Sequence, residues 1–63
     1  MKERDILFER DCYWVKAADR FKGFEVYQTG LTHSVRVASI GYAGQPGLDW
    51  AKAEIERRLS TGR

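Results

Sequence analysis

The sequence predicts an α+β fold in which a three- or four-stranded antiparallel meander packs on one C-terminal α-helix. Apolar and polar residues alternate over much of residues 13–40, and turn-forming residues interrupt the alternation, as is typical of strands joined by short turns. From Leu48 to Leu59 the apolar residues recur every three or four positions instead, which is typical of an amphipathic helix. One helix on one sheet is the simplest arrangement that buries both apolar surfaces.

The composition is that of one small globular domain. The 63 residues are 43% hydrophobic and 32% charged, which excludes a disordered chain. We therefore expect residues 1–63 to form a single domain near the lower size limit for independent folding, with residues 1–5 and 61–63 frayed. The only cysteine is Cys12 and the only histidine is His33, so the sequence predicts neither a disulfide framework nor a metal site.

The charge and hydropathy of the chain limit its partners. Eleven basic residues against nine acidic ones give a net charge of +2, which permits an anionic partner without requiring one. No apolar run reaches the length of a signal peptide or of a membrane span. We expect a cytoplasmic protein that has no membrane partner.

A first strand at Ile6–Arg10 would extend the apolar face of the sheet. A turn at Asp11 and Cys12 would place Phe8 opposite Val15 and Ile6 opposite Ala17. Neither turn residue favours positive φ as Gly or Asn does, so the sequence leaves open whether this strand forms.

The next two strands, Tyr13–Ala18 and Gly23–Thr29, are predicted to form a hairpin around the loop 19–22. Placing Ala18 opposite Gly23 pairs like with like on both faces, whereas a slip of one residue would scramble every pair. The resulting pairs are Val15 with Val26, Ala17 with Phe24, Trp14 with Tyr27, and Lys16 with Glu25.

The turn Thr29–Thr32 predicts a second hairpin. Gly30 stands where a two-residue type II′ turn needs positive φ, and the following strand, Thr32–Ile40, is rich in β-branched residues. This register pairs Thr29 with Thr32, Val26 with Val35, Phe24 with Val37, and Glu25 with Arg36.

The predicted helix has consistent signals at both of its ends. Pro46 suits the first turn, and Asp49 and Arg58 lie near the ends of the helix dipole that they complement. Glu54 precedes Arg58 by four residues, the favoured order for an ion pair. Trp50 lies off the apolar stripe, and we expect it to fold over the connector. The predicted core comprises Ile6, Phe8, Val15, Ala17, Phe24, Val26, Val35, Val37, Leu48, Ala51, Ile55 and Leu59.

The face of the sheet opposite the helix is the candidate binding surface. Aromatic rings can stack on bases, and cations can contact phosphates or guanine edges. For the charged row, mutual stabilisation across strands is the simpler interpretation. For the aromatic row a binding role is favoured, because a large exposed tryptophan is unusual. The two rows are Trp14, Tyr27 and Ser34, and Lys16, Glu25 and Arg36.

Catalytic interpretations have little support in the sequence. Cys12 and His33 are expected at different turns without an orienting partner, and the carboxylates form no constellation. The connector 41–47 leads into a helix N-terminus but lacks the spacing of a P-loop. The sequence therefore predicts a non-enzymatic protein with no cofactor and no small-molecule substrate.

The order of three strands and a helix resembles the arm-type DNA-binding domain at the N-terminus of phage tyrosine recombinases. The likeness covers roughly residues 13–59. It depends on Ile40-Gly41-Tyr42 at the end of the last strand and on Leu48, Ala51 and Ala53 at the start of the helix.

The resemblance implies that the uncovered sheet face enters the DNA major groove, with Trp14, Lys16, Tyr27 and Arg36 as the matching positions. Two features depart from the family: the 63 residues include no recombinase catalytic domain, and Glu25 dilutes a face that the family tends to keep basic. A free-standing relative or a phage-derived accessory protein would fit. The alternative is a protein-interaction or homodimerisation module that uses the same face or an edge strand.

Overall fold

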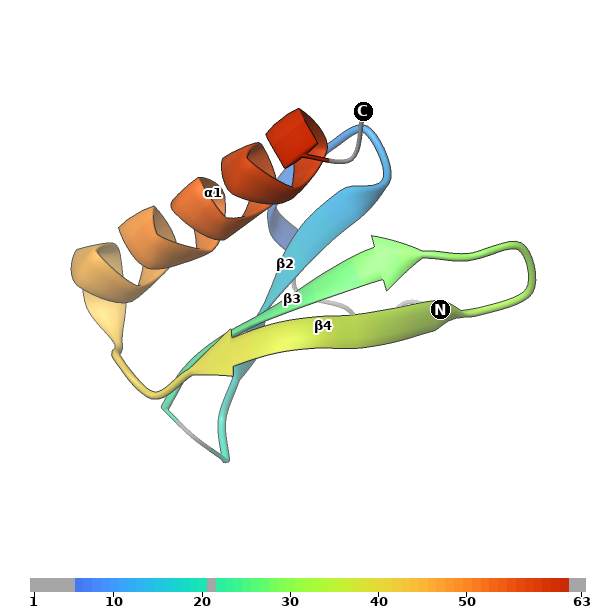
Figure 1. Ribbon diagram of the computed structural model, residues 1–63. Helices are drawn as coiled ribbons and strands as arrows, with labels where there is room; N and C mark the ends of the chain where they lie inside the picture. Colours follow the sequence, from blue (N-terminus) through green and yellow to red (C-terminus); the bar gives the residue numbers. More distant parts are fainter. Residues whose placement is uncertain (1–5, 21, 62–63) are drawn as a thin grey trace.

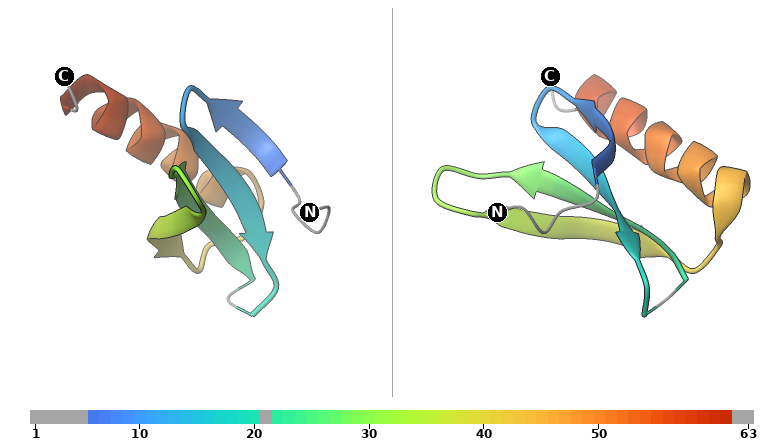
Figure 2. Two further views of the ribbon diagram at one scale, coloured as in Figure 1. Left: turned by 90° about the vertical axis from the view of Figure 1, so that its right-hand side faces the viewer. Right: turned by 180° about the vertical axis from the view of Figure 1, so that it is seen from behind.

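Four strands and one helix make up the computed structural model, which describes residues 6–20 and 22–61. The strands form one antiparallel sheet in the order β1-β2-β3-β4, and α1 lies across one face of it (Figures 1 and 2), so the predicted fold class is confirmed. Helix α1 includes Thr61, which was expected to be frayed, while the predictions for residues 1–5 and 62–63 lie outside the described residues. The elements are β1 (Ile6–Arg10), β2 (Tyr13–Ala18), β3 (Gly23–Thr29), β4 (Ser34–Ile40) and α1 (Gly44–Thr61).

Strand β1 is present, and the turn that joins it to β2 has positive φ at Asp11, although the sequence has no Gly or Asn there. Asp11 adopts φ 48°, a left-handed conformation that Asp tolerates better than most residues. Phe8 pairs with Val15 as predicted, but the register shifts before Ile6, which lies opposite Lys16 instead of Ala17. Ile6 is consequently 39% exposed, and its assignment to the core was wrong.

The β2–β3 hairpin has the predicted register at every position. Ala18 pairs with Gly23, and the four pairs that follow from this are all present. A Cβ atom on Gly23 would lie 2.0 Å from the carbonyl oxygen of Ile40, so the end of β4 approaches the hairpin at a distance that only glycine permits. The favoured pairing of like residues on both faces therefore identified the true register.

The predicted β3–β4 hairpin is wrong in both its turn and its register. Thr29 pairs with Ser34, which leaves the four-residue loop 30–33, closed by the Gly30 amide donating to the His33 carbonyl at 2.9 Å. The longer loop moves β4 by two positions and puts Val35 opposite Gln28, where it is 51% exposed instead of buried.

A β-bulge changes the register of β4 a second time. Between Val26 and Tyr27 of β3 the partner strand gains one residue, so Arg36 lies opposite Tyr27 and Ala38 lies opposite Val26. Because an extra residue reverses which side chains point to each face, Ala38 and Ile40 pack against the core beyond the bulge. Of the two β4 residues predicted for the core, Val37 packs against it as predicted, whereas Val35 is exposed.

Helix α1 packs chiefly on β3 and buries the predicted stripe. Val15, Val26, Ala51 and Ile55 are completely inaccessible to solvent, and Leu48 and Leu59 pack partly buried around them. The core also contains Tyr13, Ala38 and Ile40, which the sequence analysis did not assign to it, and Trp50 is half-buried against its edge.

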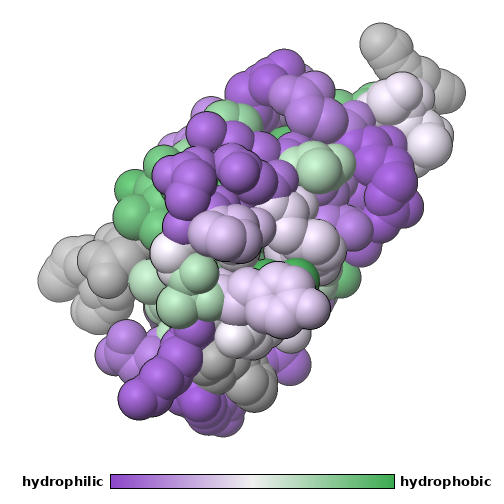
Figure 3. All heavy atoms as spheres, turned by 90° about the vertical axis from the view of Figure 1, so that its left-hand side faces the viewer, coloured by the Kyte–Doolittle hydropathy of each residue, from purple (hydrophilic) through white to green (hydrophobic). Residues whose placement is uncertain are grey.

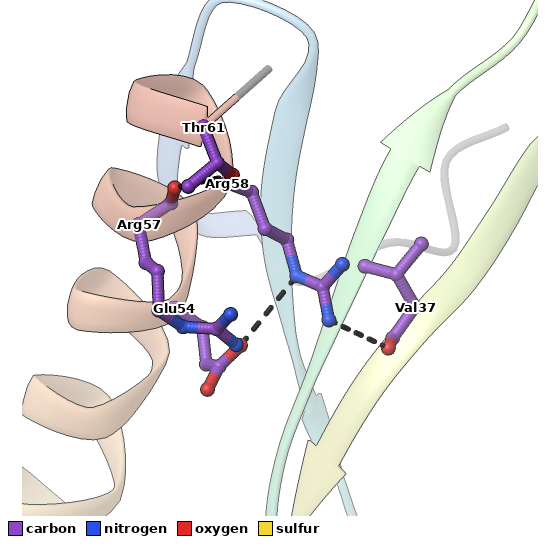
Figure 4. A network of polar contacts seen from close by, with 5 residues as sticks. All are labelled: Val37, Glu54, Arg57, Arg58 and Thr61. Carbon is purple, nitrogen blue, oxygen red and sulfur yellow. Dashed lines mark hydrogen bonds and ion pairs between the residues drawn. The ribbon is translucent and has the colours of Figure 1, made fainter.

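The C-terminal half of α1 is tied to the sheet by Arg58. Its Nη2 donates to the Val37 carbonyl at 3.2 Å, and its Nε lies 3.5 Å from Glu54 Oε1, so the predicted Glu54–Arg58 pair is confirmed. Figure 4 shows the guanidinium extending from α1 to β4 between these two partners. The contact falls on the bulge residue of β4, which is an edge strand.

Candidate nucleic-acid interface

The sheet face opposite α1, here called the outer face, carries the predicted site residues. Trp14, Tyr27 and Arg36 are consecutive cross-strand neighbours on β2, β3 and β4, and Lys16 pairs with Glu25 beside them. Ser34 was expected opposite Tyr27, but the shifted register replaces it with Arg36. The strand pairing thus brings all four predicted site residues onto one face.

Trp14 lies on the outer face but is not available to a ligand. Its ring stacks on that of Tyr27, with centroids 4.5 Å apart and planes 7° from parallel. Only 4% of Trp14 is exposed, so the expectation of a large exposed tryptophan was wrong. Of the two rings, the half-buried Tyr27 is the one that reaches solvent.

Glu25 is a buried carboxylate at the centre of this face. Its side chain is 7% exposed, yet both of its oxygens are used. Tyr27 Oη donates to Oε1 at 2.9 Å, and Arg36 Nη1 donates to Oε2 at 3.2 Å. A buried charge is stable only when it is paired and hydrogen-bonded, and these two donors supply that compensation. The predicted contact of Glu25 with Arg36 is present, but its burial was not predicted, and neither was its bond to Tyr27, two residues later on the same face.

The Tyr27 hydroxyl is held in its protonated, donating form. Burial raises the pKa of Tyr27 above its ordinary value, and the hydrogen bond to Glu25 and the charge of Glu25 raise it further. The nearby charges of Arg36 and Arg20 lower the pKa and offset part of that increase. The phenol therefore remains a donor to Glu25 throughout the neutral range.

Replacing Tyr27 with phenylalanine is expected to reduce the loss of stability at alkaline pH. A raised folded-state pKa contributes stability that is complete below the unfolded-state value of 10.0 and is lost as pH rises through the folded value. As pH rises above 10.0, the free energy of unfolding should fall more steeply for the wild type than for Tyr27→Phe, as measured by urea unfolding. Tyr42→Phe, which alters an exposed residue, is the control. Parallel curves for all three proteins would show that the Tyr27–Glu25 bond does not contribute.

A hollow on the outer face gathers three basic side chains. It has a volume of about 340 Å³, and Lys16, Arg20 and Arg36 all line it. Asp19 and Glu25 line it as well, so the basic groups exceed the acidic ones by one. Arg20 comes from the β2–β3 loop, whose conformation the strand pattern does not predict, and for that reason the sequence analysis missed it. Such a hollow can accept a phosphate or the edge of a base.

Two further hollows lie at the ends of α1. One, of about 720 Å³, is lined by Cys12, Arg58 and the ion pair of Arg10 with Glu56. The other, of about 450 Å³, lies beside Lys22 and Gly44 and is lined mainly by small and apolar residues. Figure 3, which views the end of the molecule where α1 begins, shows apolar atoms in small groups separated by hydrophilic ones.

Cys12 and His33 do not form a nucleophile pair in the described part of the chain. Thr32 Oγ1 lies 2.9 Å from Nδ1 of His33, and no hydrogen bond joins that ring to the exposed Cys12. Among residues 6–20 and 22–61, no group of three or more His, Cys, Asp or Glu side chains is placed to hold a metal ion. Within the same residues, no helix combines the length and apolar character needed to cross a membrane.

Comparison of the chain with protein-family models, with curated proteins and with solved structures gave no match.

Proposed function

We propose that this chain is a non-enzymatic cytoplasmic module that binds duplex DNA through the outer face of its sheet. The observation that carries the proposal is the meeting of Lys16, Arg20 and Arg36 around one hollow on the face that α1 leaves uncovered. Phosphate contacts by Lys and Arg supply most of the non-specific affinity of DNA-binding proteins. A small number of such contacts suits a weak or moderate binder.

The shape of the sheet supports entry into the major groove. That groove is wide enough for a two-stranded β-ribbon. The β3–β4 hairpin extends past the end of α1 as such a ribbon (Figure 1), and it carries Tyr27 and Arg36 on its outer face. The buried Trp14, on the neighbouring strand β2, supports Tyr27 by stacking on its ring. Its role in this proposal is to position Tyr27, in place of the base contact expected from the sequence.

Replacing Lys16 with alanine is expected to weaken duplex binding and to lower its salt dependence. Each lost phosphate contact reduces the slope of log K against log salt by about 1. Arg36→Ala should also weaken duplex binding, since it removes a charge and a donor group from the same hollow. Fluorescence anisotropy with a mixed-sequence duplex, between roughly 25 and 150 mM salt, measures both quantities.

Arg57→Ala provides the matched control for charge. Arg57 is an exposed arginine on α1 that pairs with Glu54, so its replacement removes the same charge from the opposite side of the sheet. The proposal requires Arg57→Ala to bind as the wild type does. An equal loss of affinity in Arg36→Ala and Arg57→Ala would mean that the outer face is not the binding surface.

A protein-interaction or homodimerisation module is the second candidate, favoured by exposed apolar side chains near β4. Leu31 is fully exposed and Val35 is 51% exposed. Strand addition at β4 is disfavoured, because the bulge interrupts the ladder and Arg58 occupies the Val37 carbonyl. Light scattering at millimolar protein concentration separates the candidates: a dimer would support a contact through Leu31 and Val35.

A further inference from the structure

We infer that Glu25 is a positioning residue that orients Arg36 to read guanine in the major groove; this inference rests on the proposed DNA-binding function. A guanidinium group carries five N–H donors in a rigid planar fork. Bidentate donation from such a fork to O6 and N7 is the commonest specific contact to guanine. What the contact needs from the protein is a fork held in a fixed orientation.

The geometry around Glu25 holds the fork from one side. Arg36 donates through Nη1 to a carboxylate that is itself fixed by the Tyr27 hydroxyl. Because the Glu25 side chain is 93% buried, as its 7% exposure implies, it has little freedom to move with the arginine. The result is an arginine anchored at one nitrogen by a rigid support.

The rest of the Arg36 side chain faces outward. It is 47% exposed, and within residues 6–20 and 22–61 its Nη2 and Nε make no hydrogen bond. Arg36 also stands on the β3–β4 ribbon opposite Tyr27, where the ribbon would enter a groove. The fork therefore keeps unoccupied donors on a half-exposed side chain that lines the hollow of the outer face, the surface proposed to meet DNA.

The negative charge of Glu25 beside Arg36 favours a base over a phosphate as the ligand of Arg36. A site that only attracts phosphate gains nothing from a carboxylate that cancels one of its positive charges, and a lysine can also attract phosphate as a point charge. A site that reads a base depends on the direction of its hydrogen bonds, so an acidic residue that fixes the arginine is useful there. Glu25 therefore weakens the attraction of phosphate but helps Arg36 to read a base.

The test compares two alternating G·C duplexes, one with guanine and one with 7-deazaguanine, which replaces the N7 acceptor by C–H and keeps the base pair. The wild type is expected to bind the guanine duplex roughly ten- to a hundredfold more tightly, the discrimination typical of a good bidentate pair. Glu25→Gln, which is isosteric and can still accept from Tyr27, should reduce that ratio to about threefold or less. Its affinity for the deaza duplex should stay the same or rise, because a negative charge has been removed.

One further variant separates positioning from charge, and one further measurement separates positioning from folding. Arg36→Lys keeps the charge and loses the fork, so it should also lose discrimination while retaining salt-sensitive binding. Thermal unfolding of Glu25→Gln establishes that the domain is folded when its ratio is measured. A merely structural role for Glu25 would weaken binding to both duplexes in proportion and leave the ratio intact.

The outcomes for the inference and for the proposed function are distinct. If the wild type binds neither duplex at low salt, the proposed function fails and the inference fails with it. If it binds both duplexes equally, or if Glu25→Gln keeps the full ratio, the DNA-binding proposal stands and the guanine-reading role of Arg36 and Glu25 is overturned. Loss of the ratio in Glu25→Gln with retained affinity for the deaza duplex supports the inference.

Discussion

Replacing Ile55 with alanine is expected to leave most of the protein unfolded at 25 °C. Ile55 is among the largest side chains that are completely buried, and it lies where α1 packs on the sheet. Truncations of this kind cost about 2–5 kcal/mol, as the sum of lost burial and the cavity left behind. A core of this size typically supplies no more than about 3–5 kcal/mol in total, so the loss is comparable with the whole stability.

Urea unfolding followed by far-UV circular dichroism measures the effect of Ile55→Ala. Leu31→Ala is the matched control, because it removes a similar number of carbon atoms from a fully exposed position. The control should change the free energy of unfolding by no more than about 0.5 kcal/mol. If the two variants lost equal stability, Ile55 would not lie in the core that the structure describes.

Replacing Gly47 with alanine is expected to destabilise the domain, although alanine is the better helix former. On propensity alone the change within α1 should stabilise by about 1 kcal/mol. The new Cβ atom would lie 2.1 Å from the Tyr42 carbonyl oxygen and 2.7 Å from the Phe24 ring, however. Overpacking of this kind costs about 1–3 kcal/mol, and the nearest atom belongs to backbone, which moves less readily than a flexible side chain.

The comparison for Gly47→Ala is Ala53→Gly, at an exposed position of the same helix. That change should cost about 1 kcal/mol from propensity alone. Both substitutions are therefore expected to lower the urea midpoint, although they exchange the same two residues in opposite directions. A higher midpoint for Gly47→Ala would show that the connector does not pack against the first turn of α1.

The β2–β3 register was predictable because both faces of the hairpin constrain it. Val15 opposite Val26 and Trp14 opposite Tyr27 agree on one alignment, and a slip of one residue breaks both. The same reasoning predicted the stripe of α1, where Ala51 and Ile55 face the sheet. In these elements, local pattern and tertiary packing favour the same structure.

The β3–β4 register was not predictable, because alternation alone does not distinguish alignments that differ by two residues. A shift of β4 by two residues leaves the Val35 side chain on the same face of the sheet. The alternation of apolar and polar residues is therefore compatible with the wrong turn as well as with the true loop. Nothing in the residues around Val37 marks the bulge that reverses the facing of Ala38 and Ile40. The preference for glycine at the first position of a type II′ turn led to the wrong turn, because Gly30 is used in a longer loop.

The sequence predicted which residues share the outer face, but not how deeply each of them is buried. The alternation of side chains along the strands predicted that Trp14, Lys16, Tyr27 and Arg36 share one face. Alternation does not predict how closely neighbouring side chains cover each of them. The stacking of Tyr27 on Trp14 and the two hydrogen bonds to Glu25 are properties of the packed sheet. The outer face therefore presents an arginine anchored by Glu25, in place of the two exposed aromatic rings that the sequence predicted.

The most direct test of DNA binding by the outer face is an NMR titration of the labelled protein with a mixed-sequence duplex at low salt. If DNA binds the outer face, the amide resonances of Lys16, Tyr27 and Arg36 are expected to shift with increasing DNA. Resonances on the solvent side of α1, such as that of Arg57, are expected to stay in place. Shifts confined to α1, or no shifts on β2, β3 and β4 at a severalfold excess of duplex, would contradict binding by the outer face.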